Sequence, residues 1–304
     1  MTAETDPPAP SDPDGEAVSD VLVGVDDSTE AAHAFRWAVT HSARFGPVTP
    51  VAAWQYPWWY YVGAPMIAPD GPGPDIEREA RTMVDALVDQ GPTGPTTDPV
   101  IRRGAAGRVL VDLAAHAQLL VVGTRGRGAL ADHVLGSVSN YCAAHSPVPT
   151  VVVPEHRPVD ERLGLIVVGI DGSPGADAAL DWVIGHADDE DRVIAYQAWN
   201  IPVITGYEGI AIDPTVVESA TVEGAAAAAA AACTRAGVAT GRVEVQVGEG
   251  DARAVLQQLG PDADLVVVGR RGHGRLAHAL LGSVTTSLLH RPVAPLVVVP
   301  PNAG

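Results

Sequence analysis

Two glycine-rich stretches carry the residue types and the spacing of a phosphate-binding loop. Gly123 and Gly126 are separated by two residues, and nine residues later Gly136 is followed by Ser137. Glycines after a strand let backbone amides approach an anion closely, since no Cβ intervenes. A helix that begins here, with Ser137 as its N-cap, presents free N–H groups and the positive end of its dipole. The first stretch therefore predicts a phosphate site.

The second stretch repeats the first with identical spacing, at Gly269, Gly272, Gly282 and Ser283. One glycine-rich turn alone is as compatible with a purely structural turn, whereas two copies with equal spacing favour phosphate binding. Neither copy is a Walker A loop, because no Gly-Lys-[Ser/Thr] is present, and neither has the glycine order of G-x-G-x-x-G. Five loop side chains are either phosphate contacts or solvated charges: Arg125, Arg127, Arg270, Arg271 and His273.

An aspartate follows the first predicted strand of each half of the chain, Asp26 in one and Asp171 in the other. Each can serve only to cap the helix that follows. Each can instead lie beside the point where the strand order of an open sheet reverses, where a carboxylate accepts hydrogen bonds from a ribose or helps to hold a metal on phosphates. The residues leave both alternatives open.

An internal repeat at an offset of 145 or 146 residues links all these features. The strand motif Val23–Ser28 returns as Val168–Ser173, and Ala53-Trp54 returns as Ala198-Trp199. Leu120–Gly126 returns as Val266–Gly272. Ordered matches of this kind with a single one-residue slip indicate a tandem duplication.

Strands and helices alternate within each half. In the first half we predict strands over 20–26, 48–54, 100–103, 119–123 and 150–153, and helices from about 27, over 75–89, over 108–117 and over 138–145. Asp27 and Glu30 have capping-box spacing at the first helix, and Ser173-Pro174 starts its counterpart. The alanine run 225–232 is predicted to lie inside a helix.

This alternation predicts an α/β protein of two tandem doubly wound domains, each a five-stranded parallel sheet with helices on both faces. We expect a disordered acidic tail over 1–19, nucleotide-binding domains over 20–154 and 164–300, and a linker over 155–163. The aromatic segment 56–74 is either a lid or a partner surface, or packs over its own sheet. The two terminal strands would leave unpaired edges, so we expect them to pair with each other in an intrachain pseudo-dimer.

The chain resembles the nucleotide-binding type of the universal stress protein family, whose signature G-x2-G-x9-G-[S/T] both halves match. The resemblance implies an adenine nucleotide, ATP with or without Mg2+, in each half. It places Asp26 and Asp171 at ribose or phosphate, and the backbones of Ala53 and Ala198 at adenine, with Gly24 and Gly169 at the ends of the first strands. It places the phosphates against Gly123, Thr124, Arg125, Gly126, Arg127, Gly128, Gly136, Ser137, Val138 and Ser139, and against Gly269, Arg270, Arg271, Gly272, His273, Gly274, Gly282, Ser283, Val284 and Thr285.

The composition of the chain disfavours several classes of binding partner. The formal net charge of −18 disfavours nucleic acid and anionic membranes, and no apolar run approaches the length of a membrane span. Two cysteines, Cys142 and Cys233, are too few for a disulfide scaffold and fit a cytoplasmic protein.

Three functions stay open on the sequence alone. We favour a regulator that senses ATP and acts on a protein partner that the sequence does not identify, and we leave homodimerisation open. The alternatives are an ATP hydrolase or adenylyl-transfer enzyme, for which we find no positioned base or nucleophile, and a dimerisation module in which only one half still binds ligand.

Overall fold

Alternating strands and helices build both halves of the computed structural model, which describes residues 20–56, 73–126, 136–200, 213–273 and 280–301. The predicted tail 1–19 and most of the aromatic segment 56–74 lie outside this range. The elements of the first half are β1 (Val21–Gly24), α1 (Thr29–Thr40), α2 (Ser42–Phe45), β2 (Val48–Trp54), α4 (Gly73–Gln90), β3 (Val100–Arg103), α5 (Ala106–Ala114), β4 (Leu119–Gly123), α6 (Ser137–His145) and β5 (Thr150–Val153).

The second half repeats this order. Its elements are β6 (Leu165–Gly169), α7 (Pro174–His186), β7 (Arg192–Trp199), α8 (Pro214–Ala236), the short 3-10 helix η1 (Thr240–Arg242), β8 (Val243–Glu249), α9 (Ala252–Leu259), β9 (Leu265–Gly269), α10 (Ser283–His290) and β10 (Leu296–Val299).

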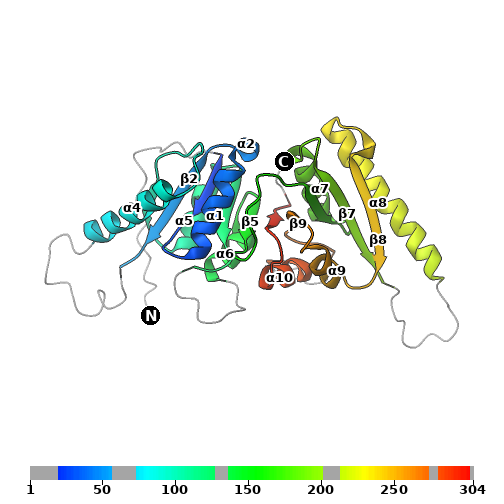
Figure 1. Cartoon of the computed structure of the whole chain (residues 1–304). Helices are drawn as coiled ribbons and strands as arrows, with labels where there is room; N and C mark the ends of the chain where they lie inside the picture. The colour runs from blue at the N-terminus through cyan, green and yellow to red at the C-terminus, as the bar shows by residue number, and fades with distance from the viewer. Residues whose placement is uncertain (1–19, 57–72, 127–135, 201–212, 274–279, 302–304) are drawn as a thin grey trace, which may run out of the picture.

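All ten strands form one sheet in the order β3-β2-β1-β4-β5-β10-β9-β6-β7-β8. Strands within each half are parallel, and the halves join through antiparallel pairing of β5 with β10. Val297 lies opposite Val151 at the centre of this pairing. The two terminal strands therefore lie side by side, as expected from their exposed edges, and Figure 1 shows the halves meeting there.

Helices cover both faces of the sheet, which confirms the doubly wound fold. Buried residues of α1, α4, α7 and α8 form one apolar cluster with the sheet, and those of α5, α6, α9 and α10 form the other. Both clusters take residues from the two halves, so the core is continuous across β5 and β10. Strands covered on both faces read as unbroken apolar runs, as in β4, where all five residues are buried.

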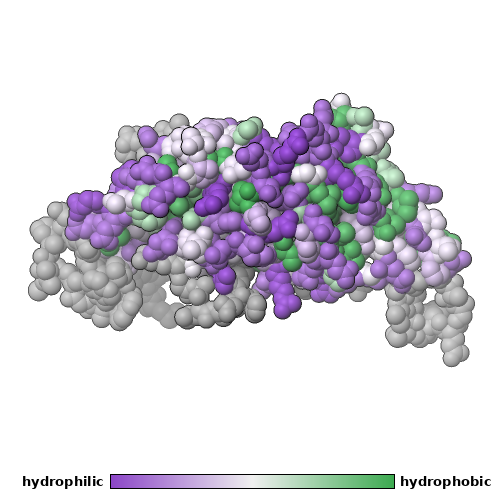
Figure 2. All heavy atoms as spheres, viewed as in Figure 1, coloured by the Kyte–Doolittle hydropathy of each residue, from purple (hydrophilic) through white to green (hydrophobic). Residues whose placement is uncertain are grey.

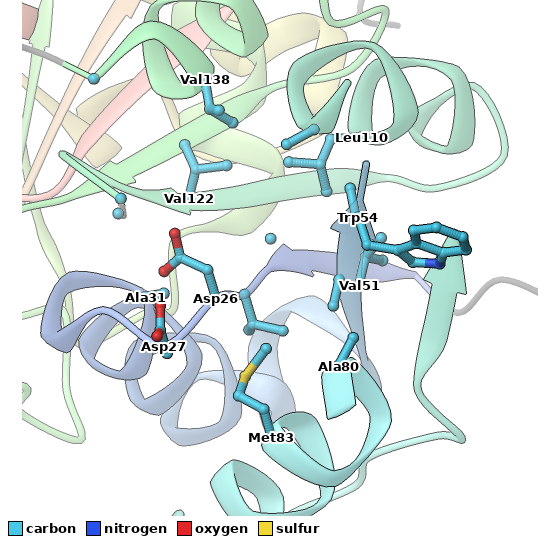
Figure 3. Close-up of a pocket in the computed structure, with 18 of the residues that line it drawn as sticks. Asp26, Asp27, Ala31, Val51, Trp54, Ala80, Met83, Leu110, Val122 and Val138 are labelled. Carbon is cyan, nitrogen blue, oxygen red and sulfur yellow. The ribbon is translucent and has the colours of Figure 1, made fainter. Parts of the chain in front are cut away.

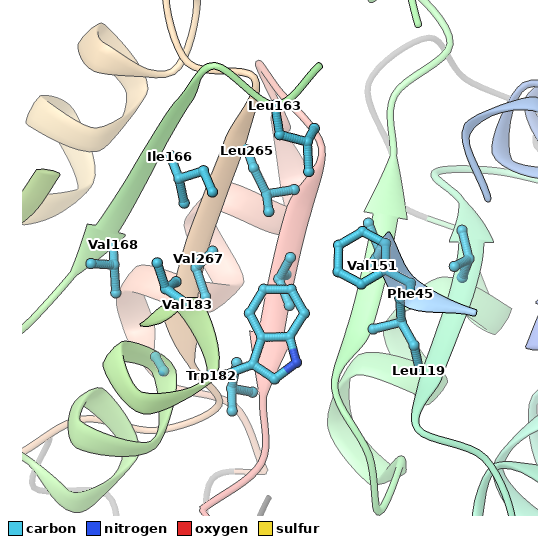
Figure 4. Packing of buried hydrophobic residues seen from close by; sticks show 14 of the residues in the cluster. Phe45, Leu119, Val151, Leu163, Ile166, Val168, Trp182, Val183, Leu265 and Val267 are labelled. Carbon is cyan, nitrogen blue, oxygen red and sulfur yellow. The ribbon is translucent and has the colours of Figure 1, made fainter. Parts of the chain in front are cut away.

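Aromatic rings add to the contact between the halves. Phe45 of α2 stacks at 5.7 Å from Trp37 of its own half and at 5.9 Å from Trp182 of the other half. Figure 4 shows Phe45 and Val151 facing the apolar residues of the second half. Beside these rings, Arg44 Nη1 lies 2.7 Å from Asp191 Oδ2, and Arg44 also pairs with Asp188. The joint between the halves thus combines strand pairing, ring stacking and a cross-half ion pair.

The first helix begins one residue later than the capping box predicts. Ser28, not Asp27, is the N-cap of α1, and its hydroxyl accepts a hydrogen bond from the Ala31 N–H at 3.1 Å. In the second half Ser173 caps α7 and Pro174 is its first residue, as predicted. The prediction failed at Asp27 because two adjacent residues are both good caps, and the aspartate two positions before Ser28 takes the supporting role described below.

Helix α8 tests the expectation that no apolar run approaches the length of a membrane span, because it is long and largely apolar, although Glu218 and Glu223 interrupt it. Among the described residues this one helix passes by length and composition. Its buried residues, Ala225, Ala229, Ala232 and Cys233, recur at helical spacing and belong to the apolar cluster of the sheet. Figure 2 shows mostly hydrophilic residues over the viewed face, with hydrophobic residues gathered on the α8 side of the second half.

Candidate functional site

The first glycine stretch connects β4 to α6 beside β1, where the strand order of the half reverses. Such a switch point, outside the carboxyl ends of the strands, is where open α/β sheets bind ligands. The Gly136 N–H donates to the Thr124 carbonyl at 2.9 Å, and the Ser139 hydroxyl donates to the same carbonyl at 2.9 Å. These bonds tie the start of α6 to the end of β4, so the helix N-terminus faces the loop.

Gly136 is the N-cap of α6, and Ser137 is the first helical residue rather than the cap. A glycine N-cap has no side chain to satisfy the first N–H groups of the helix, so they stay available to another acceptor. The prediction failed because the residue that closes the loop onto Thr124 must approach the backbone closely. A Cβ on Gly136 would lie 3.1 Å from that carbonyl oxygen.

The second half builds the same junction. The Gly282 N–H donates to the Arg270 carbonyl at 2.8 Å, and the Thr285 hydroxyl donates to the Gly269 carbonyl at 2.9 Å. Gly282 is the N-cap of α10, which begins at Ser283 and continues through Val284. Arg127, Gly128 and Gly274 lie outside the described residues.

The two aspartates lie against the glycine loops and also support the helix caps. Asp26 Oδ1 and Asp171 Oδ1 each accept a hydrogen bond at 3.0 Å, from the Ser28 and Ser173 N–H respectively. A Cβ added to Gly126 would lie 2.6 Å from Asp26 Oδ2, and Asp171 stands in the same relation to Gly272. The aspartates thus brace the cap turn, and the second glycine of each pair lets the carboxylate lie directly against the loop.

A pocket of about 700 Å³ opens at the switch point of the first half. One side is apolar and includes Val51, Ala80, Met83 and Leu110, and the other side is formed by the glycine loop and the start of α6. Figure 3 shows Asp26, Val51, Met83, Leu110 and Val122 around one hollow. Its volume lies within the range of small-molecule sites. The remaining predicted residues on its wall are Gly24, Ala53, Gly123, Arg125, Gly126, Gly136, Ser137, Val138 and Ser139.

The loop cations have different partners. Arg125 Nε lies 3.1 Å from Glu30 Oε1 and remains on the pocket wall. Arg271 Nε donates to the Leu280 carbonyl at 3.4 Å, and the His273 backbone N–H donates to Asp171 Oδ2 at 3.0 Å. Arg125 is the one of these side chains that the structure places at the described pocket.

The side chain of Arg270 was predicted to contact phosphate, but the structure places it against the other half of the chain. Its guanidinium donates to the carbonyls of Ala144 at 3.0 Å and Ser146 at 2.6 Å, at the end of α6 in the other half. Burial lowers the pKa of this guanidinium from its ordinary value. A cation at a helix C-terminus is favoured by the helix dipole. Arg270 therefore connects the second glycine loop to the C-terminal end of α6, the helix that begins at the first glycine loop.

Sequence reasoning missed the α4 wall of the pocket, formed by Ile76, Glu79, Ala80 and Met83. These residues follow ordinary helical periodicity, so no local signal separates a pocket wall from a core face. It also missed Trp54 as a lining residue, although the repeat of Ala-Trp in both halves pointed to that position.

Comparisons with known proteins identify the family of each half. The family model described as "Universal stress protein family" matches residues 18–154 and again 164–300. A universal stress protein of Mycolicibacterium smegmatis is 31% identical over 310 residues, with 93% of this chain and 97% of that protein covered. One of Mycobacterium tuberculosis is 30% identical over 292 residues, with 91% and 95% covered.

The fold agrees as well. The crystal structure of a universal stress protein from Archaeoglobus fulgidus superposes with a TM-score of 0.59 at 17% identity, covering 93% of this chain and 96% of that one. Two family matches in tandem, full-length relatives and the repeated α/β fold lead to one conclusion: the chain belongs to the universal stress protein family, as a member with two family domains in one polypeptide.

Proposed function

We propose that this protein binds ATP and acts in the cytoplasm as a nucleotide-dependent regulator of a stress response. The observation that carries the proposal is the first-half pocket, which joins an apolar wall, a carboxylate and a glycine-lined helix N-terminus in one cavity of about 700 Å³. These are the three surfaces that a base, a ribose and a chain of phosphates require.

Each part of the pocket suits one part of the nucleotide. Apolar side chains of β2, α4 and α5 offer a surface for a purine ring, next to backbone groups of Ala53. Asp26 offers a carboxylate for ribose hydroxyls. Gly123, Gly126 and the first turn of α6 offer backbone amides and a helix dipole for the phosphates. Arg125 adds a cation at the same loop.

A Mg2+ ion would depend on the nucleotide for most of its ligands. Within the described ranges, no three His, Cys, Asp or Glu side chains converge to hold a metal ion. Mg2+ is commonly bound by one or two carboxylates together with substrate phosphates, and Asp26 is the carboxylate nearest the glycine loop.

The lining of the pocket favours a regulator over a hydrolase. Its ionisable side chains within the described residues are Asp26, Asp27, Glu79 and Arg125, so a general base would have to be a carboxylate. Asp26 Oδ1 already accepts hydrogen bonds at the α1 cap. An enzyme that hydrolyses ATP needs a group that positions water in line with the γ-phosphate, and an adenylyl-transfer enzyme needs an acceptor site as well.

The test is titration calorimetry of the full chain with ATP, before and after Gly126→Ala. A methyl group at position 126 would collide with Asp26 Oδ2, so the carboxylate or the loop has to shift from its place at the pocket. Loss of one or two charge-assisted hydrogen bonds costs about 1.5–3 kcal/mol each, so we expect affinity to fall by at least about tenfold. Gly224→Ala, where a Cβ meets nothing within 4 Å, is the matched control and should leave affinity unchanged.

A second variant separates the two roles of Asp26. If its carboxylate contacts ligand, Asp26→Asn weakens ATP binding while the melting temperature stays close to that of the parent protein. Absence of ATP binding to the parent chain would refute the proposal. Equal affinities of the parent, Gly126→Ala and Gly224→Ala proteins would show that ATP binds elsewhere.

A further inference from the structure

The two halves differ at one position in the wall of the nucleotide pocket. Val51 on β2 lies opposite Gly24 of β1, and Tyr196 on β7 lies opposite Gly169 of β6. Their carbonyls accept the same backbone hydrogen bond at 2.9 Å, from Val25 in one half and from Ile170 in the other. Strand register therefore makes Val51 and Tyr196 equivalent, and one is far larger than the other.

Valine leaves space at this position. Val51 lines the first-half pocket together with Ala53, two residues further along the same face of β2, and with Leu110 of α5. This face of β2 contributes to the apolar wall of the cavity.

Tyrosine fills the corresponding space in the second half. The Tyr196 side chain is 7% exposed and belongs to the same apolar cluster as Leu256 of α9, the counterpart of Leu110. Its hydroxyl lies against Gly248 of β8, where any Cβ would collide with it. Gly248 pairs with Ala198, the counterpart of Ala53. The phenol ring thus extends from position 196 to the level of Ala198, whose counterpart Ala53 lines the first-half pocket.

The edge strands β3 and β8 also differ beside this position. Gly248 on β8 corresponds to Arg102 on β3, which pairs with Ala53. The first half combines valine on β2 with arginine on the edge strand β3, and the second half combines tyrosine on β7 with glycine on the edge strand β8. The glycine accommodates the tyrosine, because a Cβ at position 248 would collide with its hydroxyl.

A second difference points the same way. The residue after the first loop glycine is Thr124 in one half and Arg270 in the other. The Arg270 side chain is used to hold α6 of the first half, so this loop serves the joint between the halves.

We propose that the first half is the nucleotide-binding half and that Tyr196 closes the equivalent site of the second half, so that one chain binds one ATP. The inference rests on the proposed function and replaces the expectation of two sites per chain. The open half has Thr124, Val51 and Arg102 at the three positions that differ. The closed half has Arg270, Tyr196 and Gly248 at the corresponding positions.

Titration calorimetry with ATP on three full-length proteins tests the proposal. The parent chain should bind one ATP. Val51→Tyr with Arg102→Gly copies the closed pair into the first half and should abolish binding. Tyr196→Val removes the ring from the second half and should raise the stoichiometry to two. Far-UV circular dichroism and thermal melting of each variant confirm that it is folded before it is titrated.

The outcomes separate the two proposals. Two ATP molecules per parent chain would overturn the closed second half and leave ATP binding intact, whereas no binding would refute the proposed function itself. One ATP that is still bound by the Val51→Tyr, Arg102→Gly protein would assign the site to the second half and overturn the inference. A stoichiometry that stays at one after Tyr196→Val would show that the ring is not what closes the site.

Discussion

Replacing Arg44 with alanine removes the cation of the ion pair that crosses between the halves. Arg44 and Asp191 have side chains that are 12% and 5% exposed, and two of their N···O distances are 2.7 and 3.3 Å. In the variant, Asp191 keeps the backbone N–H of Asp188 at 2.8 Å but loses its cation. Removing one partner of a buried ion pair costs about 3–5 kcal/mol.

Because Asp191 retains a backbone donor, we expect the lower value, about 3 kcal/mol. With an unfolding entropy of about 2.1 cal/mol/K per residue, 1 kcal/mol shifts the melting temperature of a 304-residue chain by about 1.6 °C, so the shift should be about 5 °C. Urea denaturation followed by circular dichroism measures the free energy directly. The matched control is Arg192→Ala, whose pair with Glu244 is exposed at 58% and 45% and should contribute about 0–1 kcal/mol.

Equal losses of stability in Arg44→Ala and Arg192→Ala would refute the reasoning, since burial is the only difference that it uses. Arg44→Met with Asp191→Asn removes both charges and keeps most of the volume. This double variant should recover much of the lost stability, because no buried charge is left without a partner.

Three further predictions concern titration and backbone conformation. Burial lowers the pKa of His33 and His41, so the unfolded chain binds more protons than the folded one as the pH falls below the ordinary value of about 6.5. The free energy of unfolding, measured by urea denaturation, should therefore be highest above pH 6.5 and decrease as the pH falls. This decrease should be less steep in His41→Phe. Burial raises the pKa of Cys142 to about 12, so Ellman's reagent should label this thiol only after denaturation. Gly237 follows α8 with φ of +70°, so Gly237→Ala should lower the free energy of unfolding by about 1–2 kcal/mol. Gly224 lies inside the same helix, so Gly224→Ala should raise this free energy by about 0.5–1 kcal/mol. Urea denaturation measures both changes.

Several strands were predictable to the residue, because burial imposes apolar runs, which are continuous in β4 and lead into the arginines of the edge strand β3. The ranges 48–54, 100–103 and 119–123 coincide with β2, β3 and β4. Helix starts were less predictable, because several neighbouring residues are chemically able to cap. Ser28 and Gly136 are the observed caps, one residue away from Asp27 and Ser137.

The candidate site divides in the same way. Glycine spacing predicts the loop, since a Cβ on Gly123 would collide with the backbone of Glu30, and the structure brings Gly126 onto the Asp26 carboxylate. The destination of Arg270 could not be predicted, because it depends on where α6 of the other half lies, more than a hundred residues away in sequence. The proposed effect of Tyr196 could not be predicted either, because it depends on the register of Tyr196 with Gly169 and on Gly248 of the next strand.

Pairing of β5 with β10 inside one polypeptide has a consequence for how the protein can vary. In an assembly of identical chains, every substitution is present in both subunits, so a residue that closes one pocket closes the other. Because residues 155–163 join the two family matches in one chain, each half meets the other at an effective concentration on the order of millimolar, whatever the protein concentration. One pocket is thereby free to specialise in ligand binding, and its twin is free to become a permanent surface for assembly.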